Sequence, residues 1–126
     1  MNPAVYDAGA LVAADRNARS IWAEHRVRLE AGVIPCVPTP VIAQVSRSGR
    51  QAQLRRFLRG CDIVDFREVD AHATGRLLAR SKTSDIVDAA VVVLAMDRAA
   101  EIVTADRGDI THLLAAARIS LAIGDT

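Results

Sequence analysis

Residues 83–109 read TSDIVDAAVVVLAMDRAAEIVTADRGD, with acidic side chains at both ends of an otherwise apolar segment. Within residues 86–96 every residue except Asp88 is apolar, which predicts a helix buried inside the protein. Ser84 is a suitable N-cap, and Asp85 and Asp88 then fall in the first turn, near the positive end of the helix dipole. A carboxylate on the packed side of such a helix is costly unless it has a partner. The stretch therefore predicts a buried helix whose first turn contributes to a site.

A second acidic position follows a predicted strand. Residues 101–104 read as a short strand that leads into Asp106, and the chain begins in the same way, with residues 4–6 followed by Asp7. Open α/β sheets place their sites at the carboxyl ends of the strands. If these two strands are parallel neighbours in the centre of one sheet, their carboxylates converge with that of Asp88.

Asp7, Asp88 and Asp106 are therefore the candidate catalytic residues. Three carboxylates close together repel one another, and they are stable only with protons or cations between them. Mg²⁺ or Mn²⁺ is the expected occupant, because hard divalent ions prefer oxygen ligands. Asp85 lies three residues before Asp88, on the same helical face, and is a fourth candidate metal ligand.

Strands and helices alternate along the rest of the chain. Further strands are predicted at residues 33–37, 61–66 and 119–123, and helices at residues 8–14, 18–31, 50–59, 69–80 and 110–118, with a short helix bearing Gln44. Nearly continuous apolar strands between helices predict a three-layer α/β/α sandwich around a mostly parallel sheet of about five strands. With 126 residues, 51% of them apolar, we expect a single domain spanning residues 1–126.

These motifs, in this order, resemble the PIN domain in the form carried by VapC-type toxins of bacterial toxin–antitoxin pairs. The resemblance rests on Asp7 after a first strand, the Ser-Asp-Ile-Val-Asp-Ala run at residues 84–89, and Thr104-Ala-Asp106, and it extends over essentially the whole chain. It implies a metal-dependent ribonuclease with an acidic cluster, an RNA substrate, and inhibition by a cognate antitoxin protein. We also expect a homodimer.

One position departs from the family pattern. The family usually supplies a Glu from the helix after the second strand, where this chain has Gln44. An amide oxygen can ligate a metal ion but brings no charge, although Asp85 could restore that charge. Gln44, Thr104 and Asp109 are candidates either as ligands or as groups that support the ligands. Three hypotheses remain open. The first is a ribonuclease that uses metal-activated water, and the second is a PIN-like module that binds RNA or a protein partner without catalysis. The third, a phosphotransfer enzyme or receiver domain, ranks last because residues 7–9 lack the D-x-D of the phosphatase type and no Lys lies near a late strand.

An arginine-rich segment follows the helix that bears Gln44. Residues 47–59 contain five arginines and no acid. The candidates for binding an RNA backbone are Arg47, Arg50, Arg55 and Arg56. The same segment can also be an ordinary solvated face, and the abundance of Arg over Lys can reflect genome composition rather than phosphate binding.

The remaining features bear on partners and location. The resemblance suggests that the helical hairpin at residues 8–14 and 18–31 receives the antitoxin, although Trp22 can equally be a core residue. Aromatic residues make up only 3% of the chain, which argues against a base-stacking platform. Since no signal peptide is visible and no apolar stretch is long enough for a membrane span, we expect a cytoplasmic protein without membrane contact.

Overall fold

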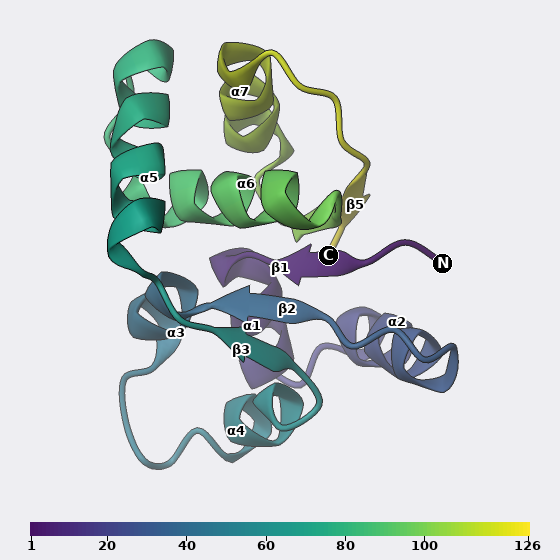
Figure 1. Cartoon of the computed structure of the whole chain (residues 1–126). Helices are drawn as coiled ribbons and strands as arrows, with labels where there is room; N and C mark the ends of the chain where they lie inside the picture. Colours follow the sequence, from purple (N-terminus) through teal and green to yellow (C-terminus); the bar gives the residue numbers. More distant parts are fainter.

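The computed structural model describes residues 1–126 and contains one sheet of five parallel strands. The strands are β1 (Ala4–Tyr6), β2 (Cys36–Pro38), β3 (Asp62–Val64), β4 (Glu101–Thr104) and β5 (Ile123–Asp125). Their order in the sheet is β3-β2-β1-β4-β5 (Figure 1). The predicted α/β fold with a parallel sheet of about five strands is confirmed.

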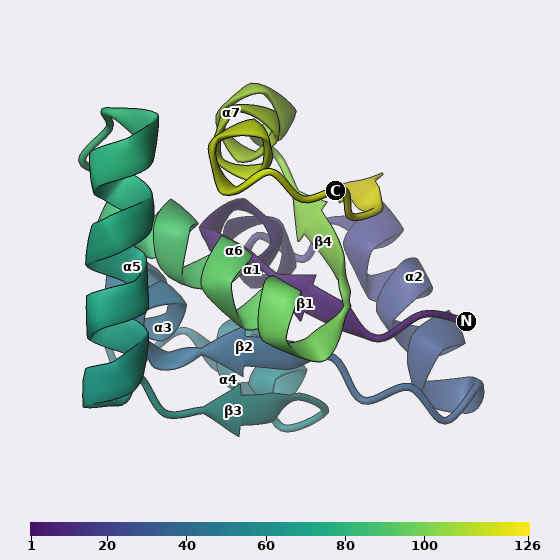
Figure 2. The ribbon, with the colours of Figure 1, turned by 45° about the horizontal axis from the view of Figure 1, so that its top comes forward.

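Helices cover both faces of this sheet. They are α1 (Ala8–Asp15), α2 (Arg19–Glu30), α3 (Thr39–Val45), α4 (Ala52–Leu58), α5 (Glu68–Ser81), α6 (Ile86–Arg98) and α7 (Arg107–Ala117). In Figures 1 and 2, α5, α6 and α7 lie on one side of the sheet, and α1, α2 and α4 lie on the other. The short helix α3 packs against both α1 and α6. None of the helices is long and apolar enough to cross a membrane.

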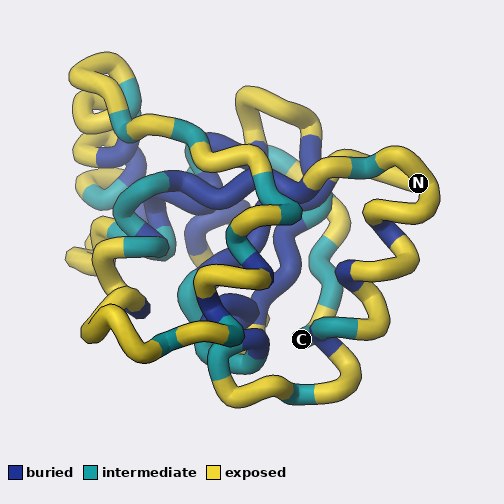
Figure 3. The backbone as a smooth tube through the Cα atoms, turned by 90° about the horizontal axis from the view of Figure 1, so that it is seen from below, coloured by how far each residue is buried: buried dark blue, intermediate teal, exposed yellow.

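The core lies where the central strands meet α6 and α1. Every residue of β1 is buried, and α6 buries Ala89, Ala90, Val91, Val92, Leu94 and Ala95. Figure 3 shows the buried segments gathered in the middle of the molecule, with exposed helices and loops around them. Burial of each Val or Leu side chain contributes about 1.5–3 kcal/mol, so these contacts fix how α6 lies on the sheet.

The strand order reverses between β1 and β4. From β1 the chain crosses to β2 and β3 on one side, whereas β4 and β5 extend the sheet on the other side. Tyr6 is in register with Val103, and the backbone N–H of Asp7 donates to the Val103 carbonyl at 3.2 Å. This reversal creates a crevice at the carboxyl ends of β1 and β4, where α/β folds bind ligands.

Several element boundaries differ from the sequence prediction. The strand predicted at residues 33–37 begins only at Cys36, since Ile34 is 62% exposed and lies outside the sheet. The strand predicted at residues 119–123 begins only at Ile123, although Ile119 and Leu121 pack against the core from a loop. The N-cap of α6 is Asp85 rather than Ser84. Helix α7 begins three residues earlier than predicted, which puts Asp109 in its first turn.

Candidate metal centre

Three helices begin at the end of the sheet where the strands have their carboxyl ends. An aspartate is the N-cap of each of them. Asp7, Asp85 and Asp106 are the N-caps of α1, α6 and α7. Each carboxylate accepts a hydrogen bond from the backbone N–H three residues later, at 2.9, 3.0 and 3.4 Å respectively. Such a cap satisfies a donor that has no partner within the helix and typically stabilises by about 1 kcal/mol. Each of these aspartates therefore caps a helix and also places a carboxylate at the carboxyl ends of the strands.

Two of these helices carry a second aspartate at the third helical position. Asp88 follows the Asp85 cap of α6, and Asp109 follows the Asp106 cap of α7. Carboxylate oxygens of Asp88, Asp106 and Asp109 all lie within 4.8 Å of one another. The structure thus brings Asp109 into the closest group of acids, and the repeated Asp-x-x-Asp spacing was the signal for it. Asp7 lies outside that closest group.

Asp7 is nevertheless held beside the cluster, almost wholly buried. It is 2% exposed, and its neighbour Thr104 is 1% exposed. The Thr104 Oγ1 atom accepts a hydrogen bond from the Asp106 backbone N–H at 2.8 Å, which ties the end of β4 to the start of α7. Burial raises the pKa of Asp7, while the Thr104 hydroxyl and the Ala10 N–H partly oppose this rise. The Asp106 carboxylate raises the pKa of Asp7 further.

The electrostatics of Asp88 identify this edge as an unusual environment. The pKa of Asp88 is raised to about 7. The largest cause is its half-buried position, and the smaller causes are the negative charges of Asp85, Asp7, Asp106 and Asp109. The hydrogen bond and charge of Asp106 likewise raise the pKa of Asp109. Perturbed carboxylates gathered in a crevice are typical of functional sites. At neutral pH this cluster must hold a proton or take up a cation.

A glycine that the sequence interpretation did not single out controls how closely these segments approach. A Cβ atom built on Gly9 would lie 2.7 Å from the Ala105 Cβ and 3.4 Å from the Asp7 Oδ1. Carbon atoms do not approach to 2.7 Å, so any side chain at Gly9 would push the start of α1 away from the segment that leads into Asp106. Gly9 therefore permits the close approach of the start of α1 to Ala105, the residue before Asp106.

His112 is a second residue whose place near the cluster the sequence interpretation missed. It lies one helical turn after Asp109 on α7, and its Nε2 atom is 2.8 Å from the Ser81 carbonyl oxygen at the end of α5. This contact connects α7 to the loop that leads into Asp85. The spacing of three residues from Asp109 was the available signal.

The other predicted candidates lie outside the close group of acids. Gln44 is exposed on α3, the helix that packs against α1 and α6. Arg47 donates to the carbonyls of Ala43 and Ser46 within its own segment.

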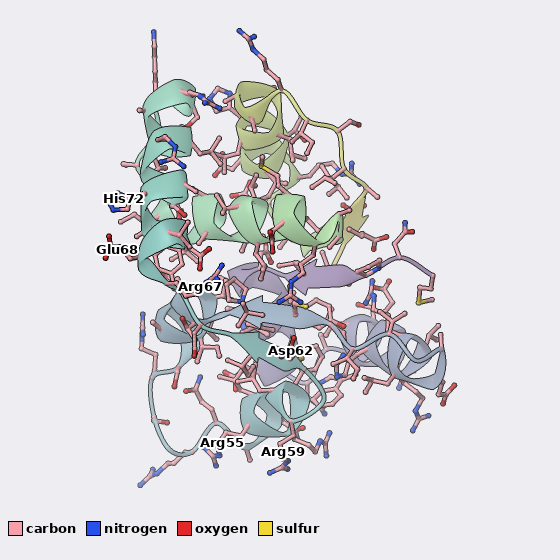
Figure 4. All side chains as sticks on the ribbon, viewed as in Figure 1. Arg55, Arg59, Asp62, Arg67, Glu68 and His72 are labelled. Carbon is pink, nitrogen blue, oxygen red and sulfur yellow. The ribbon has the colours of Figure 1, made fainter.

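The predicted arginine patch lies around α4. Figure 4 shows Arg55 at the outer side of α4, pointing away from the sheet. The Arg56 guanidinium lies over the Trp22 ring at 4.6 Å, and Arg50 is exposed. Trp22 itself is partly buried, packs against the core and donates from Nε1 to the Ala14 carbonyl at 3.0 Å. One of the predicted RNA-binding arginines is thus already engaged by an aromatic ring.

Comparisons with known proteins match the whole arrangement of elements. The structure is similar to that of VapBC2 from Rickettsia felis bound to a DNA fragment from its promoter, with a TM-score of 0.73, 19% identity and coverage of 98% of each chain. A toxin–antitoxin complex from Klebsiella pneumoniae has a TM-score of 0.65 at 18% identity, covering 84% of this chain and 88% of that one. FitAB bound to a DNA fragment has a TM-score of 0.60 at 13% identity, covering 97% and 94%. No protein-family model matches the sequence, and no curated protein matches it. The chain therefore has the fold of PIN-domain, VapC-type proteins, as the resemblance of its motifs implied.

Proposed function

We propose that this protein is a metal-dependent endoribonuclease and the toxin of a toxin–antitoxin pair. The observation that carries the proposal is the group of acids gathered where the strand order reverses, with the raised pKa of Asp88 among them. The PIN-type fold supports the same conclusion, since proteins of this shape include toxin–antitoxin complexes.

The chemistry of the acidic cluster fits a divalent cation. Ligand oxygens of Mg²⁺ lie at about 2.0–2.1 Å, so two of them on opposite sides of the ion stand about 4.2 Å apart. The oxygens of Asp88, Asp106 and Asp109, within 4.8 Å of one another, are close to that spacing. We propose that these three residues hold Mg²⁺ or Mn²⁺, with Asp7 and Asp85 beside them. When bound, the ion would lower the pKa of a water molecule and stabilise charge on the scissile phosphate.

The protein's own contribution is to hold the carboxylates still. Each N-cap uses one oxygen to accept a backbone N–H, and this hydrogen bond restricts rotation of the side chain. Thr104 is held by the Asp106 N–H and faces Asp7, so its hydroxyl fixes the orientation of that carboxylate. Hydrolysis then requires a water oxygen to bond to phosphorus while the leaving ribose oxygen departs with a proton. No covalent enzyme intermediate is needed.

We further propose that a cognate antitoxin binds the surface of α2. An open groove of about 1020 Å³ runs along this helix, and its apolar side chains include Val27 and Leu29, which are 50% and 38% exposed. Arg19, Arg26 and Arg56 line the same groove. Exposed apolar side chains beside cations suit an amphipathic partner segment with acidic residues. A homodimer also remains a prediction, which light scattering of the purified protein tests.

The second candidate function is a binding module without catalysis, and Gln44 favours it. With Gln44 in place of the usual Glu, one negative charge is missing from the helix that packs against both α1 and α6. Calorimetric titration with Mg²⁺ and Mn²⁺ separates the two functions when it is combined with cleavage of a structured RNA by the same preparation. Asp88→Asn provides the matched control. If the parent protein binds neither ion and cleaves no RNA, the binding module is the better assignment.

A further inference from the structure

A cleft separates the far ends of α5 and α7. The two helices pack against each other and both end on the same side of the molecule (Figures 1 and 2). The cleft between them has a volume of about 650 Å³ and is lined by Arg80, Ala115, Ala116 and Arg118. In Figure 4, side chains that end in nitrogen atoms project from this end of both helices. Two cations therefore flank a floor of small side chains, which leaves room for a bulky anion.

The cations around this cleft have no acidic partners. Arg76, Arg80, Lys82 and Arg118 are all exposed, and none of them takes part in an ion pair. Residues 71–84 and 110–124 contain no Asp or Glu. The positive charge at this end is therefore not neutralised within the chain.

Two of these cations occupy backbone positions that favour glycine. Lys82 is the C-cap of α5 with φ 57°, and Arg118 is the C-cap of α7 with φ 57°. This left-handed conformation disfavours residues that have a Cβ atom. The uncharged Ala99 caps α6 in the same conformation, so this geometry is common to the C-caps of α5, α6 and α7, and a cation at such a cap interacts favourably with the helix dipole.

The cleft and the acidic cluster lie at opposite ends of α7, which packs against α5. Asp109, His112 and Ala116 follow one another at spacings of three and four residues, so they lie on one face of α7. His112 contacts the Ser81 carbonyl at the end of α5, and Lys82 follows directly. At 1.5 Å per residue, Asp109 and Arg118 are separated by roughly 14 Å along α7.

We propose that the cleft between the C-terminal ends of α5 and α7 binds the phosphate backbone of the RNA strand that is cleaved at the acidic cluster. The proposal rests on the ribonuclease function proposed above. An acidic cluster repels phosphates at neutral pH, so a polyanionic substrate needs cations near it to be held there. Arginine suits this role because its guanidinium group can grip a phosphate through two hydrogen bonds.

The predicted arginine patch around α4 is less suited to this role. Arg56 is engaged by Trp22, and Arg55 and Arg59 point away from the sheet (Figure 4). We therefore assign the RNA backbone to the α5–α7 cleft rather than to that patch.

The test compares two double variants with equal changes in charge. Arg80→Gln/Arg118→Gln alters the cleft, and Arg55→Gln/Arg59→Gln alters the α4 patch as a matched control. Binding of a fluorescent single-stranded oligouridine RNA is measured by anisotropy over a series of KCl concentrations. Each protein carries Asp88→Asn and is kept in metal-free buffer, so that the probe is not cleaved. Circular dichroism verifies that both variants are folded.

We expect the cleft variant to lower the slope of log K against log salt by about 0.7 for each lost phosphate contact, and the control to leave the slope unchanged. Equal slopes for the two double variants, or no binding of RNA by their common parent, would overturn the assignment. Cleavage by the unmodified protein with Mn²⁺ is measured separately. If cleavage is absent while the cleft variant alone changes the slope, the ribonuclease function fails and the binding surface stands.

Discussion

Two polar regions lie beside β1 and β4; one contains paired opposite charges and the other contains like charges. Beside β1, the Tyr6 hydroxyl lies 2.9 Å from His25 Nδ1, and Arg28 donates to both Tyr6 and Glu101 at 3.3 Å. His25 also stacks on Phe57 with ring centroids 4.0 Å apart. In this network each charge has a partner of opposite sign. In the acidic cluster, carboxylates face one another and raise the pKa of Asp88.

The two regions contribute to the free energy of unfolding with opposite signs. A satisfied buried network stabilises the fold and fixes α2 on the sheet. A group of like charges without cations lowers the free energy of unfolding and persists only where a ligand or a proton neutralises it. Changes to the two regions should therefore have opposite effects on stability.

The largest effect should come from Asp88→Asn. If the acids hold a catalytic metal ion, this change should reduce metal-dependent RNA cleavage by at least about 1000-fold, or about 4 kcal/mol. It should also raise the melting temperature in chelator at pH 8, because it removes one of several like charges. Asp7→Asn and Asp106→Asn should act in the same direction, since Asn retains the N-cap. Destabilisation by all three variants would instead indicate structural ion pairs.

The pH dependence of stability sharpens this test. The pKa of Asp88 is about 7 in the folded protein, against an ordinary value of 3.8. Between these values the folded state binds more protons at Asp88 than the unfolded chain does, so this residue lowers stability as the pH rises. Burial lowers the pKa of His25 to about 4, so the neutral network loses stability as the pH falls below about 6.5. The gain in melting temperature from Asp88→Asn should therefore be small near pH 4 and largest above pH 7.

A smaller effect, on stability alone, is expected from Arg28→Met in the paired region. Arg28→Met removes the cation that contacts Tyr6 and Glu101, and it leaves Tyr6 fully buried and Glu101 partly buried. Loss of one partner from a buried pair costs about 3–5 kcal/mol, and we expect about 3 kcal/mol because Glu101 is partly exposed. Urea unfolding of the parent and the variant measures this cost. Metal affinity should be unchanged; a coupled loss of metal binding would contradict the separation of the two regions.

The sequence predicted the elements of this fold better than their contacts. The buried helix α6 and both site strands follow from apolar runs that end in aspartate. The N-cap was misassigned because Ser84 and Asp85 are equally good caps, and only packing decides between them. The last helix was predicted to begin only at Ile110, so the place of Asp109 in the first turn of α7 was not predicted. The Arg patch was chosen for its closeness to Gln44 in the sequence, whereas Arg80 and Arg118 come together only in the folded protein.

A third, intermediate effect is expected at Gly9. Gly9→Ala introduces a methyl group that would lie 2.7 Å from the Ala105 Cβ, so α1 or the segment leading to Asp106 must shift. Overpacking of this kind costs about 1–3 kcal/mol. A cost of about 2 kcal/mol on the metal-bound arrangement would raise the metal concentration for half-maximal cleavage roughly 30-fold. Ala105→Gly added to the same variant removes the clash and should restore the metal requirement; a simple loss of backbone flexibility at Gly9 would not be rescued in this way.

The smallest effect is expected at Gln44, on the helix beside the cluster. Gln44→Glu is nearly isosteric and adds one negative charge. If Gln44 faces the acids, it should lower the metal concentration for half-maximal RNA cleavage about tenfold, which corresponds to about 1.4 kcal/mol. Titrations of both forms with Mg²⁺ and Mn²⁺ measure the shift. An unchanged metal requirement would mean that Asp85 or another acid already supplies the charge.

The aspartate caps of α1, α6 and α7 also constrain how this protein can lose its activity during evolution. A related protein that no longer needs the activity can have many other residues in place of Asp88 or Asp109, because neither of them caps a helix. At Asp7, Asp85 and Asp106 it would lose the start of a helix unless Asn, Ser or Thr took the place of Asp. Inactive descendants should therefore be recognisable by amides or hydroxyls at the three caps, together with unrestricted substitution one turn further along α6 and α7.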